Sequence, residues 1–184
     1  MPVHANRDAP SPWVCRFAPL IRESGGVLDY ACGGGRHARW LAGRGLRVVA
    51  VDRDGAALRA LDAVDGVATV EADLEGGSWP LEGRRFDAIV VTNYLYRPRL
   101  TMLFDALEPG GVLIYETFMH GNERFGRPSN PDFLLAPGEL LERVAGEFSI
   151  VAFEQGEVER PRAAIVQRIC AVRGAGRIVR LPAS

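Results

Sequence analysis

Five short apolar segments recur along the chain, each followed by a polar turn or a stretch of helical composition. They cover residues 27–30, 47–51, 67–71, 86–92 and 112–118. Continuous apolar strands of this kind are typical of a parallel sheet that is buried on both faces. Because crossovers between parallel strands are right-handed, the pattern predicts an α/β fold with helices on both sides of one sheet.

The last part of the chain breaks this rhythm. Residues 148–155 and 163–173 also have strand composition, but only the segment GEVERPR separates them. Neighbouring parallel strands need a connection of about a dozen residues or more. The last strand is therefore predicted to run antiparallel.

Helices are predicted between the strands. Ser11 followed by Pro12 is a helix start, and apolar residues at helical spacing continue to Ile21, with a kink at Pro19. Further helices are predicted over 36–44, 55–63 and 99–107, whereas residues 74–85 contain too many glycine and proline residues for a full helix. The 184 residues are expected to form a single domain, with an N-terminal helical segment over 1–25 and a sheet core over 27–173.

Composition excludes several functions. The 22 basic residues, all of them arginine, balance 23 acidic residues, so a net charge of −1 gives no general attraction to nucleic acid or anionic lipid. Without lysine, Schiff-base chemistry and a Walker-type phosphate loop are excluded. No apolar run approaches the roughly 18 residues of a membrane span. The three cysteines, and an opening sequence without an apolar signal region, predict a reducing cytoplasmic location.

Polar residues and glycines follow the predicted strands. In an open α/β sheet, ligands bind beyond the carboxyl ends of the strands, so these residues are expected to line one cleft. The glycines at 33–35 let a ligand approach the backbone, and the helix after them offers free N–H groups to an anion. Asp52 is placed to accept hydrogen bonds from both hydroxyls of a ribose, and Asp73 from the exocyclic amine of a base.

The segment VLDYACGGG at 27–35 resembles the acidic-x-Gly-x-Gly-x-Gly motif of class I S-adenosylmethionine (SAM)-dependent methyltransferases, with Ala31 in place of the first glycine. The resemblance extends over 27–173, through Asp52, the ADL at 72–74, the FD at 86–87 and the LEPGG at 107–111. It implies a Rossmann-like, doubly wound sheet of seven strands in the order 3-2-1-4-5-7-6, with only strand seven antiparallel. Within this family, the GRH at 35–37, followed by a Trp-Leu helix, resembles the small tellurite-resistance type.

The resemblance also implies the cofactor, SAM, and the product S-adenosylhomocysteine (SAH). No metal is expected, because Cys32 and His37 lack further ligands. The residues expected to bind the cofactor follow the first four strands: Asp29, Ala31, Gly33, Gly35, Arg36, Asp52, Arg53, Asp73, Leu74 and Asn93.

Two other functions compete with this interpretation. Gly33-x-Gly35-x-x-Ala38, with Asp52 19 residues beyond Gly33, also satisfies the dinucleotide fingerprint of an NAD(P)-dependent oxidoreductase. Three features favour the methyltransferase. Asp29 lies in the segment that leads to the glycines, the chain forms a single domain, and it ends in a hairpin. A non-catalytic module that binds the nucleoside is the third possibility, and measured turnover distinguishes it.

Two segments are expected to form the site of a small-molecule methyl acceptor. One is residues 92–98, in which Tyr94 follows strand four. The other is residues 119–136, too long and irregular for a simple connection, which we interpret as a lid. Its apolar residues Phe125, Phe133, Leu134 and Leu135 favour docking, and its polar residues Arg124, Arg127, Asn122 and Asn130 are placed to face an acceptor.

Three side chains near these segments are candidates for catalysis. His120 is the candidate general base, since an imidazole titrates near pH ~6.5. Glu116 ends a buried strand, where an unpartnered carboxylate is costly, and Tyr94 follows strand four. The function predicted is methyl transfer to a small molecule, achieved mainly by positioning the reactants in a closed pocket.

Overall fold

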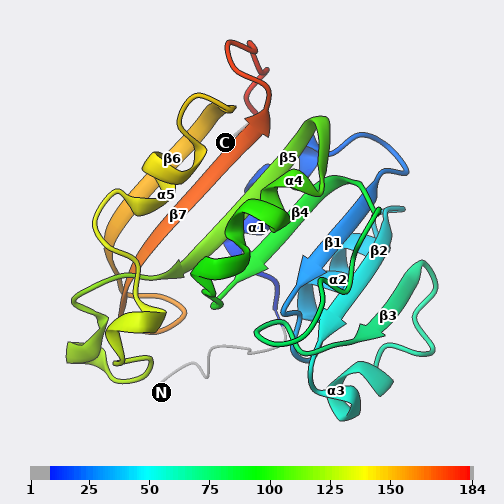
Figure 1. The fold of residues 1–184 in the computed structure, drawn as a ribbon, viewed down its shortest axis with the longest axis horizontal. Coiled ribbons are helices and arrows are strands. Elements are labelled where there is room, and N and C mark those ends of the chain that lie inside the picture. Colours follow the sequence, from blue (N-terminus) through cyan, green and yellow to red (C-terminus); the bar gives the residue numbers. More distant parts are fainter. Residues whose placement is uncertain (1–8, 183–184) are drawn as a thin grey trace.

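One seven-stranded sheet runs through the molecule (Figure 1), and the computed structural model describes residues 9–182. The strand order is β3-β2-β1-β4-β5-β7-β6, and β7 pairs antiparallel with both of its neighbours. The pairs among β1 to β5 are parallel. This arrangement confirms the predicted fold, including the antiparallel strand inferred from the short last connection. The strands are β1 (Gly26–Tyr30), β2 (Arg47–Asp52), β3 (Val67–Glu71), β4 (Phe86–Thr92), β5 (Leu107–Phe118), β6 (Phe148–Val158) and β7 (Ala164–Arg173).

The helices are shorter than the sequence predicts. They are α1 (Pro12–Phe17), α2 (Arg36–Ala42), α3 (Gly55–Arg59), α4 (Leu100–Asp105) and α5 (Glu139–Val144). At the predicted kink, α1 ends and a 3-10 turn, η1 (Ala18–Leu20), carries Pro19, whose ring nitrogen cannot donate a helical hydrogen bond. Gly45, with φ 81°, follows the end of α2, and left-handed glycine is a common helix terminator.

Helices cover both faces of the sheet (Figure 1). On one face, α1 and α2 bury apolar side chains such as Trp13 and Leu41 against the sheet. On the other face, α4 and α5 do the same through residues such as Leu103 and Leu140. The predicted absence of a helix over 74–85 is confirmed, and Leu74 and Leu81 pack in this second core. Both faces of the sheet are therefore closed, which leaves the carboxyl edge of the strands for ligands.

Strand β5 begins earlier than predicted. Leu107 already pairs with Phe86, and the register then shifts so that Val112 pairs with Ala88. Pro109 and Gly110, which the sequence alone suggests as the stop of a helix, lie within β5 at this irregularity. None of the helices within residues 9–182 is long and apolar enough to cross a membrane.

Candidate cofactor and acceptor site

A cavity of about 350 Å³ lies at the carboxyl ends of β1 to β5, where the topological rule places a ligand. Its volume falls within the roughly 300–1,000 Å³ typical of small-molecule sites. Six of the ten residues predicted to bind the cofactor line it. The lining residues are Ala31, Asp52, Arg53, Asp73, Leu74, Glu75, Asn93, Tyr94, Leu95, Thr117, Phe118, Pro128 and Phe133.

Asp52 joins the loops that follow β1 and β2. Its Oδ2 accepts the amide hydrogen of Gly33 at 2.7 Å, and its Oδ1 accepts that of Asp54 at 3.0 Å. A carboxylate offers about four lone-pair sites, so roughly two remain for other donors. The side chain is thus fixed by the backbone and still able to accept ribose hydroxyls.

Asp29 has a different position from the one predicted. It is 1% exposed and does not line the cavity; its Oδ2 accepts the Ala38 amide hydrogen of α2 at 2.9 Å. Burial raises the pKa of Asp29 to about 7, against the lowering effects of the Ala38 hydrogen bond and the nearby Arg36. Asp29 therefore holds the start of α2 against β1 from beneath the cavity.

The glycine-rich turn serves both packing and access. Gly35 has φ 71°, and a Cβ placed there would lie 2.5 Å from the Leu61 side chain. Backbone conformation and packing within the chain therefore both favour glycine at this position. A Cβ on Gly33 would meet nothing within 4 Å, which leaves open space beside the backbone. Ala31, where the family motif has glycine, keeps the left-handed conformation with φ 56°. Ala31 thus adopts a backbone conformation that favours glycine, the residue that the motif has at this position.

The loop after β3 is organised by a residue that sequence reasoning missed. Arg99 is 7% exposed, and its guanidinium donates to the carbonyl oxygens of Asp73, Gly76 and Gly77. Asp73 itself accepts the Glu75 amide hydrogen at 2.9 Å, as a turn residue does, and also lines the cavity. The signal in the sequence that could have identified this role is the position of Arg99, a few residues after β4.

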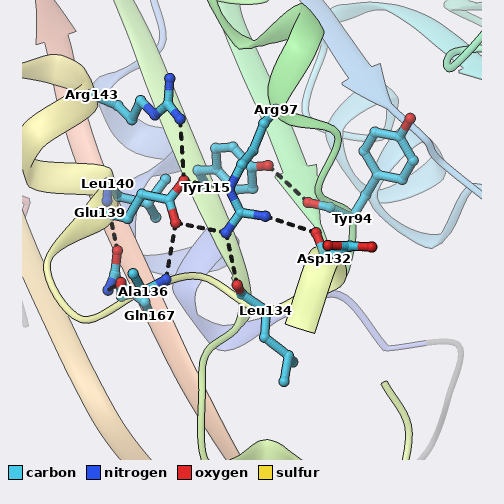
Figure 2. A network of polar contacts seen from close by, with 10 residues as sticks. All are labelled: Tyr94, Arg97, Tyr115, Asp132, Leu134, Ala136, Glu139, Leu140, Arg143 and Gln167. Atoms are coloured by element: carbon cyan, nitrogen blue, oxygen red, sulfur yellow. Dashed lines mark hydrogen bonds and ion pairs between the residues drawn. The ribbon is translucent and has the colours of Figure 1, made fainter. Parts of the chain in front are cut away.

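Asn93 and Tyr94 follow β4 and both line the cavity. Asn93 has φ 57°, and the Tyr94 carbonyl accepts the Tyr115 hydroxyl at 2.8 Å (Figure 2). The Tyr94 hydroxyl is buried without a hydrogen-bond partner in the described residues. The ring centroids of Tyr94 and Tyr30 are 5.6 Å apart. Burial raises the pKa of Tyr94 far above its usual value, so the phenol stays neutral and its ring forms part of the wall.

The structure does not bring the other candidates to the cavity. Glu116 accepts the Ser11 hydroxyl at 2.8 Å and pairs with Arg168 at 3.1 Å. The His120 side chain is exposed, and Arg36 donates to the Ala9 carbonyl at 3.2 Å. None of Glu116, His120 and Arg36 is a lining residue.

Residues 119–136 form an ordered loop closed by a bridge between Met119 and Leu135. It contains two 3-10 turns, η3 (Asn122–Phe125) and η4 (Pro131–Phe133). Leu134 and Leu135 are buried as expected, but Phe125 and Phe133 are exposed. Of the whole loop, only Pro128 and Phe133 line the cavity.

Three of the four polar loop residues predicted to face an acceptor have other partners. Asn122 bonds the Pro128 carbonyl and the Ile165 amide, and Asn130 accepts the Asp132 amide hydrogen. Arg124 lies 3.9 Å from Glu157, and Arg127 is exposed outside the cavity lining. In the described part of the chain, no cluster of three or more His, Cys, Asp or Glu residues is arranged to hold a metal ion.

The sheet order defines a Rossmann-like α/β fold, and the cavity with the anchored Asp52 marks a candidate ligand site at the carboxyl edge of the sheet. Residues 27–111 match the sequence model of a family described as a methyltransferase domain. With the motif at 27–35 and this fold, that match makes the chain similar to SAM-dependent methyltransferases over less than half of its length. A search of curated proteins gives no match.

Solved structures share the fold. TehB from Haemophilus influenzae superposes with a TM-score of 0.72 at 19% identity, over 89% of this chain and 62% of that protein. A TehB-like SAM-dependent methyltransferase from Corynebacterium glutamicum gives 0.65 at 18% identity, over 88% and 86% of the two chains. Coclaurine N-methyltransferase bound to N-methylheliamine and SAH gives 0.67 at 11% identity, over 88% and 71%. The chain thus spans less than two thirds of the length of the Haemophilus protein.

Proposed function

We propose that this protein transfers the methyl group of SAM to a small-molecule acceptor, mainly by positioning the two reactants in the cavity. The observation that carries the proposal is the lining of that cavity. Its side next to β2 and β3 is polar and charged, whereas its side next to β4, β5 and the loop is mostly apolar. A nucleoside and an acceptor therefore each find a suitable surface within one cavity.

The residues fit the cofactor on the charged side. Asp52 has lone pairs free for hydroxyl donors, Asp73 faces the same space, and the open volume beside Gly33 admits a ligand close to the backbone. When bound, SAM would supply an electrophilic methyl group for the acceptor, and neutral SAH would be the leaving group. Alignment of two reactants is worth about 7–11 kcal/mol in well-oriented systems, so the chain's main task is to orient and to exclude water.

Proton transfer is a secondary part of the proposal. The Tyr94 phenol is neutral and its oxygen is buried, so it contributes a wall rather than a base. The roles of Glu116 and His120 as catalytic groups stay predictions, because both side chains lie outside the lining. We also propose a cytoplasmic location, which the three unpaired cysteines Cys15, Cys32 and Cys170 support.

Substitution of Asp52 tests the cofactor site. We expect Asp52→Ala to weaken SAH binding at least tenfold, about 1.4 kcal/mol, because both a ribose acceptor and the anchor of the Gly33 amide are lost. Asp54→Ala is the matched control, since Asp54 caps α3 and lies outside the lining. Calorimetry with SAH measures both variants, and an unchanged affinity in Asp52→Ala would contradict the assignment.

The two competing functions give different results in the same assay. An oxidoreductase binds NADH and not SAH, whereas a non-catalytic module binds SAH but releases none from SAM with any acceptor. Mass spectrometry of the nucleoside that copurifies, followed by detection of SAH release during an acceptor screen, distinguishes all three.

A further inference from the structure

The side of the cavity away from Asp52 has no charged side chain among its described lining residues. Leu95 follows β4, Phe118 ends β5, and Pro128 and Phe133 come from the loop at 119–136. We call these four residues the apolar wall. The charged lining residues, Asp52, Arg53, Asp73 and Glu75, all follow β2 or β3.

Phe133 is an unusual member of the apolar wall. Its neighbours Leu134 and Leu135 are 1% and 0% exposed, and Leu134 packs in a cluster with Phe118. Phe133 lines the cavity and remains 43% exposed. Burial of an aromatic ring is favourable, so an exposed phenylalanine in the cavity lining favours a ligand that covers it.

The backbone on both sides of Phe133 is fixed by one arginine (Figure 2). Arg97, three residues after Tyr94, donates from Nη1 to the Asp132 carbonyl and from Nη2 to the Leu134 carbonyl, each at 2.8 Å. These two carbonyls flank Phe133 in the sequence. A single guanidinium therefore joins the segment after β4 to the backbone that carries the ring.

Glu139, at the start of α5, holds that guanidinium in place. Its two carboxylate oxygens accept from Arg97 Nε and Nη2, each at 2.8 Å, and Oε2 also accepts the Ala136 amide hydrogen. Burial raises the pKa of Glu139, but the Arg97 and Ala136 hydrogen bonds outweigh it and lower the pKa below its usual value. Glu139 therefore stays charged at neutral pH, and the bidentate pair fixes the orientation of Arg97.

These contacts do more than stabilise the loop. Leu134 and Leu135 already dock it by burial, whereas the Arg97 contacts fix the short stretch whose side chain is left exposed. The arrangement keeps an exposed aromatic residue in the cavity lining, on backbone that Arg97 holds from both sides.

We propose that the apolar wall is the acceptor subsite, that it takes an uncharged apolar or aromatic acceptor, and that Arg97 is the positioning residue that holds Phe133 against that acceptor. The inference rests on the proposed function and deepens it by naming the class of acceptor. Anionic acceptors, including metalloid oxyanions and carboxylates, are disfavoured, because three carboxylates and a single guanidinium line the described cavity. The loop residues Arg124 and Arg127 are not in the lining.

Matched pairs of ligands test the acceptor class by binding to the SAH complex. The pairs are para-methylbenzyl thiol with para-carboxybenzyl thiol, para-cresol with para-hydroxybenzoate, and para-toluidine with para-aminobenzoate. The two members of each pair have the same nucleophile, and one carries a methyl group where the other carries a carboxylate. Calorimetry is expected to show at least tenfold tighter binding of a neutral member, with tellurite as a further anionic probe.

Two pairs of variants test the residues. Phe133→Ala is expected to weaken binding of the neutral ligand at least tenfold, whereas Phe125→Ala, the other exposed phenylalanine of the loop, leaves it unchanged. Arg97→Ala is expected to have a similar effect and Arg97→Lys a partial one. Arg143→Ala is the control, because Arg143 also contacts Glu139, at 3.4 Å, and bonds no loop carbonyl. In turnover assays, Arg97→Ala should raise the acceptor KM more than it lowers kcat, while SAH affinity stays within twofold.

The outcomes separate this inference from the proposed function. Failure of wild-type protein to bind SAH overturns the proposed function. If the protein binds SAH but binds the carboxylates or tellurite as tightly as the neutral ligands or more tightly, the acceptor class alone is overturned. The same holds if it binds SAH but none of the neutral ligands. Loss of SAH affinity and acceptor affinity together in Arg97→Ala, or equal effects in Arg143→Ala, overturns the positioning role.

Discussion

His37 shows how one buried side chain couples the fold to pH. It is 1% exposed, and its Nε2 accepts the Ser11 amide hydrogen at 3.1 Å, which requires the neutral ring. Burial, with a smaller contribution from Arg36, lowers the pKa of His37 to about 3. Relative to an unfolded value near ~6.5, the folded protein then loses stability as pH falls from about 6.5 toward 3.

Asp29 has the opposite effect. Its pKa is raised to about 7, so its contribution to stability is complete below the unfolded value near ~3.9 and is lost as pH rises through about 7. As pH rises from ~5.0 to ~7.5, His37 increases the free energy of unfolding by about 2 kcal/mol, and Asp29 decreases it by about the same amount. The two contributions therefore nearly cancel in the natural protein.

A variant that removes the titration of His37 or of Asp29 should reveal the pH dependence caused by the other residue. We expect His37→Gln, which keeps an acceptor oxygen, to be more stable by about 2 kcal/mol at pH ~5.0 than at ~7.5, because only Asp29 still titrates. Asp29→Asn should show the reverse slope. Urea unfolding at the two pH values measures both, and parallel pH profiles for the two variants would contradict the assignment.

At the scale of elements, the loop after β3 depends on α4 and its preceding turn. Arg99 ends η2 (Arg97–Arg99) and donates to the loop carbonyls, with its guanidinium 5.9 Å from the Trp79 ring centroid. The loop has no helix of its own, so these contacts set the position of Asp73 and Leu74 in the cavity. Side-chain contacts thus hold a loop that carries cavity-lining residues and has no regular secondary structure.

Removal of that guanidinium should loosen the loop and the cofactor site with it. We expect Arg99→Met to weaken SAH binding about tenfold, equivalent to about 1.4 kcal/mol, while the protein remains folded in thermal unfolding without ligand. Arg84→Ala is the control, because Arg84 stacks on Phe86 at 5.7 Å and lies outside the cavity lining. Unchanged SAH affinity in Arg99→Met would show that the loop keeps its shape without the arginine.

The strands and the cavity were predictable because both follow from short-range patterns and one topological rule. Apolar β-branched runs located the strands, and their carboxyl ends located Asp52 and Asp73. The side chains of Glu116 and Asp29 were not predictable, because their partners, Ser11 and the Ala38 amide, are set by packing on one face of the sheet. Sequence position gives the end of a strand, but not which group a side chain there will meet.

At the scale of the whole molecule, Ser11 connects the start of the described chain to distant elements. Its amide donates to His37 in α2, its hydroxyl donates to Glu116 in β5, and that hydroxyl oxygen caps α1 by accepting the Trp13 amide hydrogen at 3.1 Å. The indole of Trp13 then donates to the Ile169 carbonyl of β7 at 3.3 Å. Ser11 therefore joins the N-terminal helix to α2 and β5, and Trp13 adds a contact with β7.

The hydroxyl of Ser11 is expected to carry much of this connection. Ser11→Ala removes a helix cap, worth about 0.5–2 kcal/mol, and one partner of the partly buried Glu116, so we expect a loss of about 2 kcal/mol in the free energy of unfolding. Ser11→Thr keeps a hydroxyl and should retain most of the stability. Urea denaturation measures both variants. A loss below about 0.5 kcal/mol in Ser11→Ala would mean that Trp13 and the rest of α1 hold the N-terminal segment by apolar packing alone.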